Sequence, residues 1–366
     1  MAARQERIDP ARRIEQARIN AEKNASGAAE QPSGGTAPKG RPTPPRNPRA
    51  GARSGNPGVR AAAVGQSRDT AAGPGPVTWR DWVGGARIRT LPMAVSPVLV
   101  GTGAAIVASP PGAYHWVRAL LCLAIAVLLQ IGVNFANDYS DGIRGTDAAR
   151  VGPSRLVGSN GVSPRRVLVV ALSFFALAAL AGLALTITTG LWWLLAVGAA
   201  AIVAAWFYTG GKRPYGYMAL GEVFVFLFFG LVATLGTMYV QVFTLSQEAW
   251  IGAIGAGLIA CGALEVNNLR DRAQDALSGK RTLAVLLGAT GAKILYGVFL
   301  LVPFVLAGWL ALFYPLAWVA VAGLLAALPA CLIAWTGRTP QELILALKLT
   351  GVAQLIYGIG LFVAFL

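Results

Sequence analysis

The feature that most constrains this chain is a series of long apolar runs. About 20 apolar residues in a helix cross the roughly 30 Å hydrocarbon core of a bilayer, and runs of that length occur about nine times. Their approximate limits are 90–109, 116–137, 166–188, 190–209, 217–241, 249–267, 289–311, 313–335 and 343–366. The sequence therefore predicts an all-α, polytopic membrane protein with about nine transmembrane helices.

Composition supports this prediction and argues against nucleic acid as a partner. The chain is 55% hydrophobic and only 13% charged, with a mean hydropathy of +0.58, values outside the range of an ordinary soluble domain. The net charge of +15 is shared between the first 78 residues and the apolar remainder. We therefore expect a lipid bilayer as the environment and no nucleic acid.

The first 78 residues differ from the rest. They are rich in Pro, Gly, Ala and Arg and nearly free of aromatic residues, a composition that buries too little apolar surface to offset the entropy of ordering. We expect residues 1–78 to be a disordered, basic, cytoplasmic extension and residues 79–366 to be the transmembrane domain. A solvated arm that helps to fix topology is favoured here over an arm that binds anionic lipid or RNA.

The loops between the runs alternate in charge. Lys and Arg gather in every second connection, at positions 144, 150, 155, 165, 166, 212, 213, 270, 272, 280, 281, 293 and 338. On the other side, Arg118 is the only clear cation. Because cytoplasmic loops carry the excess of Lys and Arg, we expect a cytoplasmic N-terminus, an outside C-terminus and about nine crossings of a bacterial cytoplasmic membrane.

Two acidic motifs lie at the cytoplasmic ends of apolar runs, NFANDYSDGIRGTD (134–147) and NNLRDRAQD (267–275). Helical spacing places the oxygen-bearing side chains of each motif on one face. Such oxygen-only sets, without His or Cys, suit Mg²⁺, which commonly bridges to a phosphate. The side chains concerned are Asn134, Asn137, Asp138, Asp141, Asp147, Asn267, Asn268, Asp271 and Asp275.

An alternative for these acids is a simple ion pair, for example between Asp271 and Arg270 or Arg272. Two similar motifs on one side of the membrane favour metal binding over that alternative. An acid inside the membrane is energetically costly, so its presence indicates a functional site by default. Two further acids, Glu222 and Glu265, lie inside apolar runs. Glu265 could support the second motif from behind or accept a proton. Glu222 could cap a helix or pair with another group near the membrane interface.

Cations follow both motifs and the fourth apolar run. The stretches GPSRLV, WFYTGGKRPYGY and SGKRT supply Arg155, Tyr208, Lys212, Arg213, Lys280 and Arg281. Lys and Arg hold phosphate oxygens, so these cations fit a phosphorylated substrate. A purely topological role is the alternative for each of them. SGKRT lacks the glycine spacing of a P-loop.

The chain from about residue 79 onwards resembles the UbiA superfamily of intramembrane prenyltransferases. The resemblance depends on NDYSD (137–141) and NNLRDRAQD (267–275), the two Asp-rich motifs of the superfamily. Further stretches, WVGGARIRTLPMAVSPVLVG, GPSRLVGSNGV and YTGGKRPYGYMALGEVFVFLFFG, look like the branch that acts on 1,4-dihydroxy-2-naphthoate in menaquinone biosynthesis. The resemblance implies nine helices around a central cavity, a polyprenyl diphosphate donor and Mg²⁺.

The resemblance also implies roles for particular residues. The Mg²⁺ ligands would be Asn137, Asp138, Asp141, Asn267, Asp271 and Asp275, with Asp147 replacing an acid that the family often has where Gly145 stands. The leaving diphosphate would be bound by Arg155, Lys212, Arg213, Lys280 and Arg281. Tyr208 would stabilise an allylic cation, and Arg87 would meet the aromatic acid.

The expected reaction follows from these roles. The naphthoate carbon that bears the carboxylate attacks the allylic cation, carbon dioxide is lost, and a demethylmenaquinone results. Two alternatives stay open at this point. One is a UbiA-type enzyme with another acceptor, and the other, from a different class, is an ion or metabolite transporter with intramembrane acids along its pathway.

Overall fold

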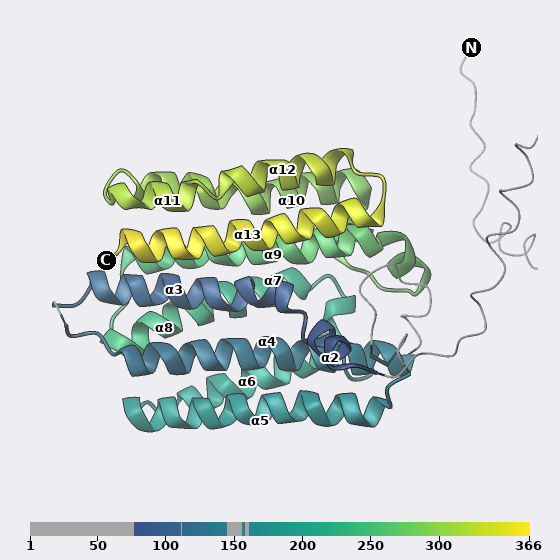
Figure 1. The fold of residues 1–366 in the computed structure, drawn as a ribbon, viewed down its shortest axis with the longest axis horizontal. Helices are drawn as coiled ribbons and strands as arrows, with labels where there is room; N and C mark the ends of the chain where they lie inside the picture. The colour runs from purple at the N-terminus through teal and green to yellow at the C-terminus, as the bar shows by residue number, and fades with distance from the viewer. Residues whose placement is uncertain (1–76, 111, 145–155, 158–160) are drawn as a thin grey trace, which may run out of the picture. The chain divides into compact units, whose positions relative to one another are not determined.

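The computed structural model describes residues 77–366 apart from 111, 145–155 and 158–160. These residues are mostly helical (Figure 1). In chain order the α-helices are α2 (Trp79–Ala86), α3 (Leu91–Val107), α4 (Trp116–Arg144), α5 (Pro164–Thr189), α6 (Leu194–Phe207), α7 (Gly221–Val225), α8 (Ala233–Val242), α9 (Gln247–Leu277), α10 (Leu283–Leu310), α11 (Trp318–Val321), α12 (Leu324–Thr336) and α13 (Pro340–Ala364). Shorter elements are η1 (Ile88–Thr90), η2 (Tyr215–Tyr217), the π-helical η3 (Phe226–Val232) and η4 (Pro315–Ala317). The all-α, polytopic fold expected from the sequence is confirmed.

Each of the nine predicted runs contains helical residues. Within the described residues, eight helical segments are long and apolar enough to cross a membrane, and α6 is an apolar helix of 14 residues. The first segment begins earlier than the apolar run, because α2 and η1 precede α3. The predicted extension lies outside the described residues except for Val77 and Thr78.

The helices run side by side and largely along one direction (Figure 1). In this view α10, α11 and α12 form the top layer, α9 and α13 the next, and α5 the bottom, with α3, α4, α6 and α8 between them. The main packing partners are α4 with α5, α9 with α10 and α13, α3 with α8 and α13, and α12 with α13. The acid motifs lie near the ends of α4 and α9, so this packing decides whether they meet.

The chain is rich in Gly and Ala, and such small residues allow membrane helices to approach one another closely. At the crossing of η3 and α9, a Cβ added to Gly230 would lie 2.7 Å from Cα of Gly257. The main core contains many fully buried alanines, including Ala253 and Ala256 on the same helix. The π-helical η3 therefore packs on α9 backbone to backbone.

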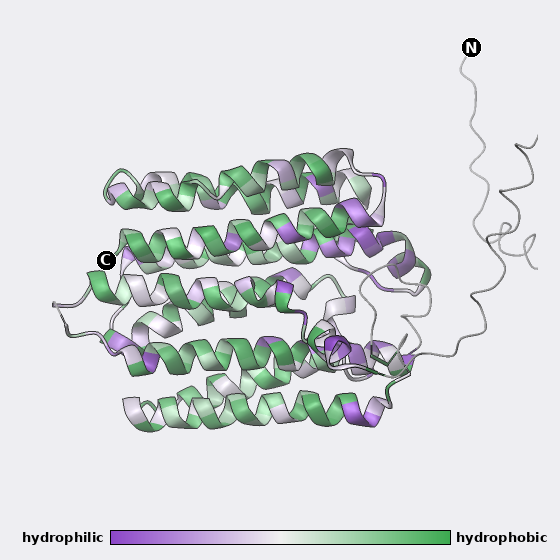
Figure 2. Cartoon of the chain, viewed as in Figure 1, coloured by the Kyte–Doolittle hydropathy of each residue, from purple (hydrophilic) through white to green (hydrophobic). Residues whose placement is uncertain are grey.

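Hydrophilic residues concentrate at one end of the bundle, where α9 ends and α13 begins (Figure 2). Near the opposite end, Arg118 is hydrogen bonded across helices: it donates to the carbonyls of Thr188 at 2.8 Å and Val240 at 2.9 Å. Both carbonyls belong to last turns of helices, α5 and α8. Since a cation is favourable at a helix C-terminus, Arg118 ties three helices together at that end.

Candidate active site

A large cavity of about 1220 Å³ lies inside the bundle. Its lining on α4 runs from Cys122 to Asp141, which is about 28 Å of helix at 1.5 Å per residue. Along most of that length the walls are apolar and contain many small side chains from α5 and α6. Amide and carboxyl side chains, among them Asn137, Asp138 and Asn267, line the other part. The cavity thus combines a polar end with a long apolar channel.

The first acid motif lies on the last turns of α4. Asp138 is 2% exposed, and its Oδ2 accepts a hydrogen bond of 2.9 Å from the backbone N–H of Leu156. Its Oδ1 is buried and accepts no hydrogen bond from any described residue. Asn137 Oδ1 accepts a bond of 2.7 Å from the Thr209 hydroxyl. This oxygen-rich surface leaves one buried acceptor, Asp138 Oδ1, for a cation.

A glycine holds the loop against this motif. A Cβ added to Gly142 would lie 2.3 Å from Cγ1 and 2.5 Å from Cβ of Val157. Only a residue without a side chain leaves room for Val157 there, and Leu156 next to it donates to Asp138. Gly142 therefore permits the contact that orients the carboxylate.

The second acid motif lies on the last turns of α9. Both oxygens of Asp271 accept bonds from the Arg270 guanidinium, at 2.8 Å from Nε and 2.7 Å from Nη2. This is the ion pair that the sequence offered as an alternative to metal binding. Asp275 pairs instead with Lys280, at 3.5 Å between Oδ1 and Nζ. Asn267 and Asp275 line the cavity, whereas Asp271 is not among its lining residues.

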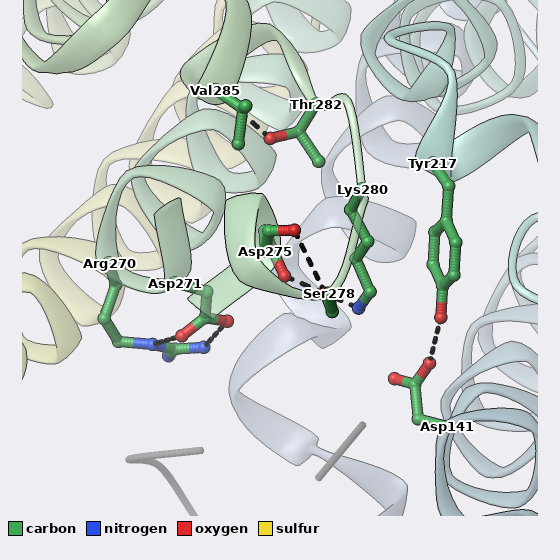
Figure 3. A network of polar contacts seen from close by, with 9 residues as sticks. All are labelled: Asp141, Tyr217, Arg270, Asp271, Asp275, Ser278, Lys280, Thr282 and Val285. Carbon is green, nitrogen blue, oxygen red and sulfur yellow. Dashed lines mark hydrogen bonds and ion pairs between the residues drawn. The ribbon is translucent and has the colours of Figure 1, made fainter. Parts of the chain in front are cut away.

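Tyr217 and Lys280 link the two motifs (Figure 3). The Tyr217 hydroxyl donates to Oδ1 of Asp141 at 2.7 Å, and Lys280 Nζ lies 4.4 Å from the centre of the Tyr217 ring. Lys280 also pairs with Asp275, so a continuous series of contacts runs from α9 to α4. Burial, with the Asp141 carboxylate beside it, raises the pKa of Tyr217 above its usual value. The hydroxyl therefore remains a proton donor at physiological pH.

The remaining predicted cations lie differently. Lys212, Arg213 and Arg281 are exposed and are not lining residues of the cavity. The backbone N–H of Arg281 donates to the Tyr217 carbonyl at 2.9 Å, which ties the α9–α10 loop to η2. Arg155 and Asp147 lie outside the described residues. The predicted roles of all five remain predictions.

Aromatic side chains form a wall beside the polar end. Tyr208 lines the cavity, and its ring meets that of Tyr215 edge-on at 5.5 Å between centroids. Tyr215 in turn stacks on Phe224 at 4.1 Å. The negative faces of aromatic rings attract cations. This wall is therefore suited to a positively charged intermediate, as the resemblance implied for Tyr208.

The turn between α2 and α3 brings arginines into the cavity. Arg87 has a left-handed backbone, with φ 51°, and ends α2. The Thr90 hydroxyl donates to its carbonyl at 2.9 Å and accepts bonds from Gln130 at 2.7 Å and Asn134 at 3.1 Å. These bonds attach the turn to α4. Arg87 and Arg89 both line the cavity as a result.

The two membrane-embedded glutamates lie behind the cavity wall. Glu222 is 4% exposed, and its Oε1 accepts a bond of 2.9 Å from Nδ2 of Asn268, which does line the cavity. Glu265 is fully buried on α9. Glu222 thus orients a cavity amide from behind, a pairing that sequence spacing could not reveal because the partners are 46 residues apart.

The side chains at the polar end fit a hard cation, although they form two groups in this structure. Asp138 and Asp141 come from α4 and Asp275 from α9, with Lys280 and Tyr217 between them. Among the described residues, no three His, Cys, Asp or Glu side chains are close enough to form a metal cluster. Within the described part of the two acid motifs, Asp138 Oδ1 is the buried carboxylate oxygen that lacks a hydrogen bond.

Comparison with known proteins identifies the fold and the family. The model of the UbiA prenyltransferase family matches residues 94–350. The 1,4-dihydroxy-2-naphthoate octaprenyltransferase of Mycobacterium tuberculosis is 48% identical over 283 residues, which cover 77% of this chain and 96% of that protein. The enzyme of the same name from Haemophilus influenzae is 40% identical over 225 residues, 60% of this chain and 73% of that protein.

Solved structures show the same fold. A UbiA homologue from Aeropyrum pernix K1 superimposes with a TM-score of 0.58 at 19% identity, covering 75% of this chain and 98% of that one. A UbiA homologue from Archaeoglobus fulgidus bound to GPP and Mg²⁺ gives 0.55 at 15% identity, covering 77% and 99%. With a family match over most of its transmembrane region, this chain belongs to the UbiA prenyltransferase family.

Proposed function

We propose that the protein transfers a polyprenyl chain from its diphosphate to 1,4-dihydroxy-2-naphthoate, with Mg²⁺ bound and with loss of carbon dioxide. The observation that supports this most directly is the cavity. Its polar end collects acids and amides from both motifs, and the cavity as a whole extends over about 28 Å along α4, most of it apolar. A diphosphate head and a long isoprenoid tail need those two environments in that order.

The relatives support the choice of substrates. Two proteins that are 48% and 46% identical bear the name of 1,4-dihydroxy-2-naphthoate octaprenyltransferase. The Archaeoglobus fulgidus homologue holds GPP with Mg²⁺. These substrates, and the loss of the carboxyl group, are our proposal for this chain.

Mg²⁺, when bound, neutralises the charge that develops on a departing diphosphate. The ligands that we propose are Asn137, Asp138, Asp141, Asn267, Asp271 and Asp275, with Asp147 as a further candidate. For Asp271 this role requires the carboxylate to leave Arg270, with which it is paired here. Lys280 is already between the motifs and would bind a diphosphate oxygen. Arg155, Lys212, Arg213 and Arg281 would approach from the loops.

The bond changes balance without a redox partner. The allylic C–O bond breaks and its electron pair leaves with the diphosphate. The ring carbon bearing the carboxylate forms the new C–C bond, and the carboxylate then leaves as carbon dioxide, returning its electron pair to the ring. The product is demethylmenaquinone in its reduced form. Tyr208 would stabilise the allylic cation, and Arg87 would contact the acceptor.

Purified protein in detergent tests the proposal. We expect prenylated product and an equal amount of carbon dioxide from 1,4-dihydroxy-2-naphthoate and a polyprenyl diphosphate, both lost with EDTA and restored by Mg²⁺. Asp141→Asn and Asp275→Asn should lower turnover by at least about 100-fold, the scale of losing a group that stabilises developing charge. Mass spectrometry measures both products.

Glu248→Gln is the matched control, because this acid lies at the other end of α9, where it accepts a bond of 3.0 Å from Tyr314. It should keep wild-type turnover. Full activity of Asp141→Asn would count against the metal site. Diphosphate release only with another aromatic acceptor would move the protein to a sister branch, and the absence of diphosphate chemistry with every acceptor would revive the transporter hypothesis.

A further inference from the structure

Lys348 is an exposed cation on the largely apolar helix α13. It lies eight residues after the start of α13, about 12 Å along the helix, and it lines the cavity. Across the described part of the chain, no side chain forms an ion pair or hydrogen bond with its ammonium group. Ionisable residues within membrane helices are costly and mark sites of function. An anion is therefore the expected partner.

Neighbouring contacts show which part of the cavity Lys348 faces. Gly351, one turn further along α13, packs on the turn between α2 and α3: a Cβ added there would lie 3.3 Å from the carbonyl oxygen of Arg89. Leu347 packs against a cluster that contains Met93 of α3. Arg89 lines the same cavity and, like Lys348, has no acidic partner among the described residues.

The depth of Lys348 separates it from the diphosphate end. On α13, Leu343 packs against a cluster that contains Leu269 of α9, and Leu347 packs against a cluster that contains Ala260 and Ala263 of the same helix. Lys348 is therefore level with a part of α9 at least six residues, about 9 Å, deeper than Asp275. Lys280 already occupies the position beside Asp275. We therefore expect Lys348 to bind a second anion, deeper in the membrane than the diphosphate, and not the diphosphate itself.

We propose that Lys348, with Arg89, binds the carboxylate of the aromatic acceptor. This inference rests on the proposed function, which supplies an acceptor with one carboxylate. The contact orients the acceptor ring toward the polar end, where the allylic carbon is released. It also distinguishes substrate from product, because the carboxylate departs as carbon dioxide. The neutral product then lacks this contact and leaves for the lipid.

Kinetics of Lys348→Met test the assignment. Loss of a charge-assisted hydrogen bond should raise the acceptor KM by about 10- to 100-fold. The KM of the polyprenyl diphosphate should stay close to the wild-type value. Lys348→Arg should restore most of the acceptor affinity, because it keeps the charge. The inhibition constant of 1,4-dihydroxynaphthalene, which lacks the carboxylate, should be the same in wild type and Lys348→Met.

Lys293→Met is the matched control. This lysine lies on α10 and donates to the backbone carbonyl of Trp335 at 2.7 Å, away from the cavity lining. It should behave as wild type. An unchanged acceptor KM in Lys348→Met would overturn the proposal. Lys348 would then be a lysine whose ammonium group only reaches toward water at the surface. A raised diphosphate KM would assign Lys348 to phosphate instead.

A second variant guards against misfolding. Lys348→Gln keeps a polar side chain, and its selectivity for the naphthoate over 1,4-dihydroxynaphthalene should fall as in Lys348→Met. Equal losses of affinity for the two compounds would contradict carboxylate recognition. Failure of the proposed function has a different signature, since wild-type protein would then form no product from the naphthoate at all.

Discussion

At the scale of single residues, Tyr217 joins the two acid motifs through its two ends. Its hydroxyl donates to Asp141 and its ring supports Lys280. Tyr217→Phe removes the hydroxyl alone and leaves the Asp141 oxygen without that donor. We expect kcat/KM to fall by about 10- to 100-fold, the effect of losing a hydrogen bond to a charged group, while thermal stability in detergent changes little.

Tyr217→Leu provides the comparison, because it removes the ring as well. We expect a larger loss than in Tyr217→Phe, with a raised KM for the diphosphate as Lys280 loses its aromatic neighbour. Wild-type kinetics in both variants would show that the link between the motifs has no part in turnover.

The acids and the cations paired with them could be found from the sequence, whereas Tyr217 and Lys348 could not. Asp138, Asp141 and Asp275 stand out because acids are rare in apolar runs, and helical spacing groups them. Tyr217 and Lys348 have no such signal: tyrosine is common at membrane interfaces, and a single lysine reads as a surface charge. Only the packing of α13 and η2 brings these two into the cavity.

At the scale of elements, Gly142 sets how closely the described residues Leu156 and Val157 approach α4. Gly142→Ala would force Val157 away from the helix and weaken the bond from Leu156 to Asp138. We expect turnover to fall by at least about tenfold, with a loss of stability of about 1–3 kcal/mol from overpacking. Enzyme assays and thermal unfolding in detergent measure the two effects.

Gly297→Ala is the control for this change, because a Cβ on that α10 glycine would meet nothing within 4 Å. It should retain activity and gain slightly in helix stability. If Gly142→Ala also kept full activity, the close packing of Val157 would have no bearing on the orientation of Asp138.

The helices themselves followed from apolar run length, but their irregular parts did not. The π-helical η3 depends on the close crossing of Gly230 and Gly257, and hydropathy does not report such a contact. The separation of α2 from α3 depends on the left-handed Arg87 and on bonds from α4. Tertiary contacts therefore decided the details that position the cavity arginines.

At the scale of the whole described bundle, hydrophilic residues concentrate at the end that holds both acid motifs (Figure 2). The positive-inside rule predicts that this end faces the cytoplasm. The polar end of the cavity would then open toward the water-soluble naphthoate, and the apolar part would stay within the bilayer.

Single cysteines in a cysteine-free background test this orientation. The three native cysteines, Cys122, Cys261 and Cys331, are free thiols and would first be replaced by alanine. We expect a membrane-impermeant maleimide to label Ala113→Cys and Leu366→Cys in intact spheroplasts, because both positions are exposed at the end opposite the acids. Gln341→Cys, at the start of α13, should react only after the membrane is opened.

The reverse pattern would place the acid motifs outside, where the cell makes neither substrate, and would contradict the proposed function together with the orientation. Labelling of all three positions in intact spheroplasts would indicate mixed insertion. If the labelling follows the expected pattern, the charge of the loops fixes the side of the membrane from which Lys348 and the acid motifs receive their substrates.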